Sequence, residues 1–110
     1  MAAGFVQIPW YATGFRADAL EKALAQIAPI AMRYGARSYV VYRMREDRYR
    51  FNQIAEFESK LDFERYWYGE EFVEWRATHS SWYQIPVIYG WADRVTVGSL
   101  DAAALEPAEQ

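Results

Sequence analysis

The sequence contains no cysteine and only one histidine among its 110 residues. The lack of cysteine excludes disulfide bridges, a thiolate nucleophile and cysteine-ligated metal sites. No hydrophobic run approaches the ~18 residues that a membrane-spanning helix needs. Residues 1–3 (MAA) also lack the positively charged start of a secretory signal. We therefore expect a cytoplasmic protein that does not enter a membrane.

Most of the chain also has no excess of acidic or of basic residues. Three of the 15 acidic residues lie in the last ten positions, so the rest of the chain carries as many acidic as basic groups. A neutral body lacks the basic face that nucleic-acid phosphates require. The arginines of residues 43–50 surround Glu46 and Asp47 and are typical of a solvated, mixed-charge turn. We expect no nucleic-acid partner.

Hydrophobic residues make up 53% of the sequence and charged residues 25%, which excludes disorder over most of its length. The length fits a single domain. We place that domain at residues 1–98. The acidic, alanine-rich tail over residues 99–110 is expected to fray or to pack loosely on a partner.

Aromatic side chains are abundant, because twenty of the 110 residues are Phe, Trp or Tyr. A small domain buries only roughly 60–65% of its unfolded surface, so twenty large rings crowd one core. Three explanations remain open: a subunit interface, a pocket for a flat apolar ligand, or a ring-rich core with some half-exposed tyrosines.

The hydrophobic pattern along the chain predicts alternating strands and helices. Residues 4–11 predict a strand in which Pro9 favours an edge, a bulge or the strand's end. Residues 16–33 have helical periodicity, Pro29 should kink or end that helix, and Gly35 suits a left-handed cap. Further predicted elements are strands at 36–45 and 49–57, a helix opened by Ser59, a break at Gly69, a helix at 70–80, and a strand region at 82–97 with a bulge or edge at Pro86 and Gly90.

This order is that of a ferredoxin-like βαββαβ fold, an α+β class with a four-stranded antiparallel sheet and helices on one face. Because helices cover only one side, the other sheet face needs a partner. We expect a homodimer in which the two sheets face each other, giving a dimeric α+β barrel.

The segment over residues 57–72 (FESKLDFERYWYGEEF), with Tyr34-Gly35-Ala36 before the hairpin, resembles the antibiotic biosynthesis monooxygenase family of dimeric α+β barrels. In that family the third strand ends in Trp-Glu-Ser, a capped helix follows, and a second helix begins with a short Ser/Glu/Asp-x-Phe stretch. The resemblance in organisation covers roughly residues 4–97. It implies a cofactor-free monooxygenase acting on a quinol or a polycyclic phenolic, polyketide-like substrate in an aromatic pocket.

Family positions transfer only in part. The Trp and Asn that polyketide oxygenases carry on the third strand correspond here to Phe57 and Gln53. The helix Trp and axial His of the haem-degrading branch correspond to Tyr66 and Arg76, and the first strand has no Asn, so haem degradation is disfavoured. Gln53 still offers an amide donor and acceptor to a substrate oxygen.

The candidate catalytic residues are therefore His79, Arg76 and Gln53. Arg76 would hold a phenolate, or else pair with Glu56, Asp62 or Glu74 or reach solvent. His79 would act as a base, or serve only as a structural residue near a helix end. The candidate substrate-binding residues are Phe57, Tyr66, Trp67, Phe72, Trp75 and Tyr11.

No metal or other cofactor is expected, because one His, no Cys and the isolated pair Glu70/Glu74 do not make a ligand set. Two other functions stay open: a non-catalytic dimeric module that binds a small hydrophobic ligand, and a cyclase or isomerase acting on a related aromatic substrate. An oxygen electrode separates the oxygenase from both.

Overall fold

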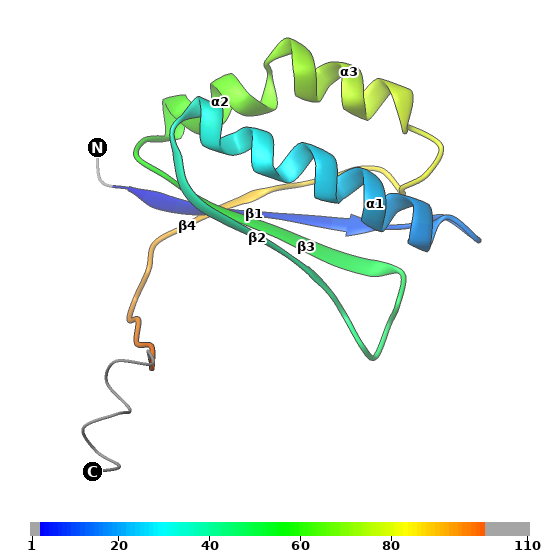
Figure 1. Cartoon of the computed structure of the whole chain (residues 1–110), viewed down its shortest axis with the longest axis horizontal. Helices are drawn as coiled ribbons and strands as arrows, with labels where there is room; N and C mark the ends of the chain where they lie inside the picture. The colour runs from blue at the N-terminus through cyan, green and yellow to red at the C-terminus, as the bar shows by residue number, and fades with distance from the viewer. Residues whose placement is uncertain (1–2, 101–110) are drawn as a thin grey trace.

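The computed structural model describes residues 3–100 and shows an α+β fold with a four-stranded antiparallel sheet covered by helices on one face (Figure 1). This confirms the predicted fold class. The elements in chain order are β1 (Gly4–Tyr11), α1 (Ala17–Ile27), the 3₁₀ helix η1 (Ala28–Tyr34), β2 (Ala36–Arg43), β3 (Arg50–Phe57), α2 (Lys60–Trp67), α3 (Glu70–Thr78) and β4 (Gly90–Ala92).

The strand order is β2-β3-β1-β4, which places β1 inside the sheet. β1 pairs with β3 along its whole length, from Gly4 opposite Phe57 to Tyr11 opposite Arg50. β4 pairs only with residues 5–7 of β1. Pro9 therefore lies beyond the part of β1 that pairs with β4. Its missing backbone N–H costs no hydrogen bond to β4 there.

Only the first part of the helix predicted over residues 16–33 is an α-helix. α1 stops at Ile27, and the chain tightens into η1 with Pro29 in its first turn, where a missing N–H is tolerated. Gly35 then ends η1 with a φ of 99°, the left-handed conformation that glycine adopts without strain. The tightened turn sets the path from the helices into β2.

The two later helices begin and end close to the predicted positions. The Ser59 Oγ accepts a hydrogen bond from the Asp62 backbone N–H at 3.2 Å, as an N-cap should. In a complete capping box the Asp62 side chain would also accept from the Ser59 backbone N–H. Here the Asp62 carboxylate accepts from Arg65 instead. Gly69 separates α2 from α3 and allows the sharp change of direction between them.

The strand region predicted over residues 82–97 forms only in part, and Gly90 begins that part at the edge of the sheet, as expected. Apart from an isolated bridge between Ala12 and Tyr83, only β4 forms there. Residues 84–89 run without helix or strand through a cis Ile85–Pro86 bond. Proline cannot donate to a strand ladder, which accounts for the interruption. After β4 the chain leaves the sheet (Figure 1), and Val95 is 95% exposed.

The domain boundary at residue 98 stays a prediction. Residues 99 and 100 of the predicted tail are exposed, and its remainder, 101–110, lies outside the described residues.

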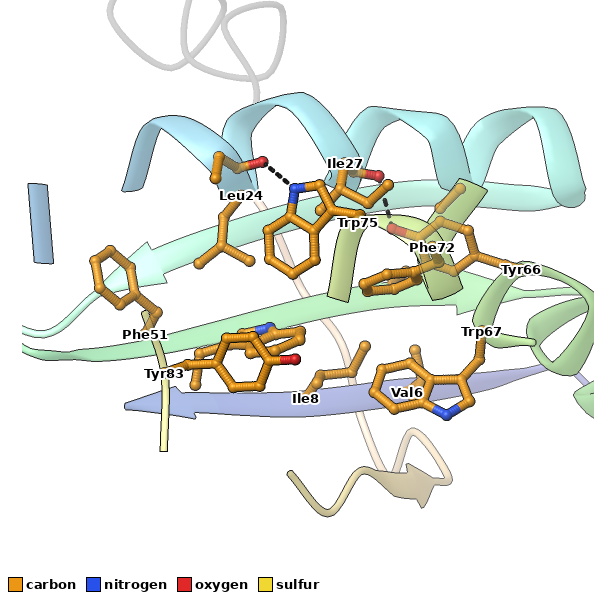
Figure 2. Packing of buried hydrophobic residues seen from close by; sticks show 14 of the residues in the cluster. Val6, Ile8, Leu24, Ile27, Phe51, Tyr66, Trp67, Phe72, Trp75 and Tyr83 are labelled. Atoms are coloured by element: carbon orange, nitrogen blue, oxygen red, sulfur yellow. Dashed lines mark hydrogen bonds between the residues drawn. The ribbon is translucent and has the colours of Figure 1, made fainter. Parts of the chain in front are cut away.

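Burial alternates along β3. Phe51, Gln53, Ala55 and Phe57 are buried beneath the helices, and the intervening side chains face the other way. Figure 2 shows large rings filling the space between sheet and helices. The slot expected between these layers is thus occupied by the protein's own side chains, chiefly Trp10, Phe57, Phe63, Tyr66, Trp67, Phe72 and Trp75.

Candidate functional site

A chain of hydrogen bonds crosses the buried interior. The Trp10 indole donates to the Gln53 Oε1 at 3.0 Å, and the Gln53 Nε2 donates to the Tyr66 hydroxyl at 3.0 Å. The Tyr66 hydroxyl in turn donates to the Ile27 carbonyl at 2.7 Å (Figure 2). Since Gln53 is engaged at both ends of its amide and is fully buried, it fixes Trp10 and Tyr66 in place and presents no free group to a ligand.

This interior position makes Tyr66 a determinant of alkaline stability. Burial raises the pKa of the Tyr66 phenol above its ordinary value of 10.0, with a smaller opposing effect from the Gln53 hydrogen bond. The native state therefore keeps a proton that the unfolded state loses above about pH 10. The corresponding stability is fully present below pH 10 and declines as the pH rises further, by up to ~1.4 kcal/mol per pH unit.

We predict that Tyr66→Phe flattens this alkaline decline, which urea unfolding at pH 8 to 11 measures. Because other tyrosines also titrate in this range, the comparison is the difference in slope between variant and wild type. Equal slopes would contradict the account. At pH 8 the variant should already be less stable by roughly 1–3 kcal/mol, since it leaves the Ile27 carbonyl and the Gln53 amide without their partner.

Arg76 lies on α3 with its guanidinium over two rings. The guanidinium carbon is 3.8 Å from the centre of Trp67 and 4.9 Å from that of Phe72. Its Nη1 is buried without a hydrogen-bond partner among the described residues, and no ion pair with Glu56, Asp62 or Glu74 forms there. Burial lowers the pKa of Arg76. The ion pair considered from sequence is therefore replaced by cation–π contact.

An open groove lies between α1 with η1 on one side and α3 on the other. Its volume is about 410 Å³. Ile27, Ile30 and Trp75 supply its apolar surface. The Trp75 indole donates to the Ala23 carbonyl of α1 at 3.2 Å, which joins the two helices across the groove (Figure 2). The polar lining residues are Gln26, Glu71, Glu74, Thr78 and His79.

His79 lines this groove and is oriented by its own helix. Its Nδ1 lies 2.7 Å from the Trp75 carbonyl oxygen, and its ring centre is 4.7 Å from the rings of Trp75 and Trp82. A carbonyl oxygen can only accept, so Nδ1 carries the proton in the neutral ring. Nε2 is then the nitrogen with a free lone pair. The arrangement provides an oriented base beside an indole wall.

The structure brings together only two of the predicted site residues, His79 and Trp75, in one open groove. Gln53, Phe57, Tyr66 and Phe72 lie in the interior. Arg76 and Trp67 face each other outside the groove lining, and Tyr11 lies on the open sheet face near Tyr49.

Sequence reasoning missed the groove residues from α1 and η1, namely Gln26, Ile27 and Ile30. Helical periodicity assigned the apolar side of the 16–33 segment to the core, but it carried no signal for which later helix lies against it.

The described residues contain no group of three or more His, Cys, Asp or Glu side chains placed to hold a metal ion. Among the helices within residues 3–100, none is long and apolar enough to cross a membrane.

No protein-family model matches the chain. No curated protein matches it either. Solved structures do match. PA3566 from Pseudomonas aeruginosa aligns over 87% of this chain and 97% of its own, with 20% identity and a TM-score of 0.76. A candidate antibiotic biosynthesis monooxygenase from Nitrosomonas europaea covers 84% and 90%, with 14% identity and a TM-score of 0.76.

SnoaB from Streptomyces nogalater, a cofactor-independent oxygenase, aligns over 88% of this chain and 97% of its own, with 15% identity and a TM-score of 0.74. The chain has the fold of the antibiotic biosynthesis monooxygenases. This agrees with the resemblance in residues 57–72. At these identities the likeness to the monooxygenases concerns the fold alone.

Proposed function

We propose that the protein is a cofactor-independent oxygenase that oxidises a phenolic aromatic substrate in the groove between α1 and α3. The observation that carries the proposal is the oriented His79, whose Nδ1 binds the Trp75 carbonyl and whose Nε2 is left for a substrate proton. The monooxygenase fold, shared with a structure described as a cofactor-independent oxygenase, supports the reaction class.

The groove offers a phenol both apolar and hydrogen-bonding contacts. Ile30 and the small exposed parts of Trp75 and Ile27, which are otherwise buried in the core, provide apolar contacts for a ring. The phenol hydroxyl donates a hydrogen bond, and the neutral His79 Nε2 accepts one. Binding therefore places the acidic proton of the substrate directly on the proposed base.

In the proposed reaction, the phenol proton moves to His79 Nε2 and leaves an electron-rich phenolate. The phenolate passes one electron to O₂, and the resulting superoxide and phenoxyl radical combine at an ortho or para carbon that bears hydrogen. His79 returns its proton to this peroxide, and the hydroperoxide loses water as its O–O bond and the C–H bond at the same ring carbon break. The sum is phenol plus O₂ to quinone plus water, so the substrate supplies all the electrons and His79 is regenerated.

Oxygen uptake with 1-naphthol tests the proposal, because this probe has a free para position. We expect uptake of one O₂ for each 1,4-naphthoquinone formed. Saturable binding of 1-naphthol without oxygen uptake would replace the oxygenase with a ligand-binding module. Conversion to an isomer under anaerobic conditions would favour the cyclase or isomerase.

We also propose that a second copy covers the open face of the sheet. Phe5, Val40 and Ile54 lie on that face, which carries no helix (Figure 1). All three are only partly buried in the single chain. The Arg94 guanidinium lies 4.2 Å over the Phe5 ring. A twofold-related sheet would cover these side chains and leave both His79 grooves on the outside.

Light scattering coupled to size-exclusion chromatography is expected to give twice the chain mass of 12.9 kDa. Ile54→Lys places a charge in the middle of the face and should give a monomer. Val73→Lys, on the exposed side of α3, is the matched control and should remain a dimer. A monomeric wild type at micromolar concentration would overturn this proposal.

A further inference from the structure

The groove presents acceptors more than donors to a ligand. Glu71 and Glu74 supply carboxylates, and the neutral His79 supplies the lone pair of Nε2. No lysine or arginine of residues 3–100 lines it. A substrate that carries a carboxylate would thus meet like charge, while one with an additional donor would find a partner.

The two carboxylates differ in their availability. The negative charge of Glu71 is already compensated by an ion pair, since its Oε2 lies 2.9 Å from the Arg33 Nη2. Its Oε1 also accepts from the Tyr34 hydroxyl at 3.1 Å. Glu74 makes no hydrogen bond or ion pair with any residue in the 3–100 range. Glu74 therefore leaves the groove with one uncompensated negative charge.

We infer that the substrate is an aromatic amine, a phenol with a protonated amino group on a short arm, and that Glu74 binds this ammonium. The inference rests on the proposed function, in which the phenol end meets His79. Glu74 and His79 both line the groove, on either side of Trp75 along α3. A phenol with a two-carbon amine arm would lie along the groove beside Trp75, with its hydroxyl at His79 and its ammonium at Glu74.

Three probes of nearly equal shape separate the charge from the ring: tyramine, 4-ethylphenol and 4-hydroxyphenylacetate. Because the chain has one histidine, the imidazole NMR signals of the whole protein report on His79 alone. We expect tyramine to bind most tightly, 4-ethylphenol less tightly, and 4-hydroxyphenylacetate most weakly. Equal affinities, or tightest binding of the acid, would overturn the inference.

Glu74→Gln keeps the shape of the side chain and removes its charge. It should weaken tyramine binding by about 10- to 100-fold and leave 4-ethylphenol binding nearly unchanged. Glu70→Gln is the matched control, because Glu70 is exposed on the same helix but does not line the groove. A preference for tyramine that survives Glu74→Gln would also overturn the inference.

The outcomes distinguish the two proposals. Tyramine preference without oxygen uptake from any phenol contradicts the oxygenase and supports the aromatic-amine site. Oxygen uptake from neutral phenols without tyramine preference contradicts the amine site and supports the oxygenase. If no probe moves the His79 signals, both are wrong.

Discussion

Oxygen uptake by His79→Gln is expected to be about 10²- to 10⁴-fold slower than that of the wild type, with 1-naphthol as substrate. Glutamine fills a similar volume, but its amide cannot accept and hold a proton as imidazole does. The loss should therefore fall on kcat, while KM changes little, because Trp75 and the isoleucines still bind the ring.

Arg76 provides the discriminating comparison for this prediction. Its guanidinium stacks on Trp67 and does not line the groove, so Arg76→Met should leave kcat close to the wild-type value. If Arg76→Met lowers kcat as much as His79→Gln does, the reacting ring binds beside Arg76, and the assignment of the groove is wrong.

Phe72→Ala is expected to lower the free energy of unfolding by roughly 3–5 kcal/mol. Phe72 is fully buried, and its ring centre lies 4.6 Å from that of Tyr66 and 5.0 Å from that of Trp67. Truncation leaves a cavity that the surrounding large rings cannot close by small shifts, since protein interiors are tightly packed. Urea unfolding measures the change.

The neighbouring Val73→Ala is the control, because Val73 is 44% exposed on the other side of the same helix. Its effect should stay within about 0.5–1 kcal/mol. Similar losses for both variants would show that the interior next to Phe72 is loosely packed, and would reopen the space between sheet and helices as a ligand site.

Much of the fold could be predicted because its signals are local. Ser59 and Gly35 mark helix ends by local chemistry, Ser59 through its hydroxyl and Gly35 through its left-handed backbone. Most of the strand predicted over residues 82–97 does not form, because residues with high β propensity also need a neighbouring strand to pair with. Around Pro86 no neighbour completes a ladder, so only β4 forms.

The site was harder to predict because it depends on which helices meet. At 3.6 residues per turn Phe72, Trp75, Arg76 and His79 share one side of α3, but this period does not show which neighbouring element each side chain meets. His79 lies on the side of α3 that lines the groove, while Arg76 lies over Trp67 on the other side. Gln53 was predicted to meet a ligand, yet Trp10 and Tyr66, both distant in sequence, take up its amide.

The most direct test of the account is turnover of 1-naphthol under ¹⁸O₂ by the purified, chelator-treated protein, followed by mass spectrometry of the quenched product. We predict one ¹⁸O atom in the new quinone carbonyl, the second in water, and almost no labelled product from His79→Gln. Unlabelled or absent quinone from the wild type, or equal labelling by both proteins, would contradict oxygenation at the His79 groove.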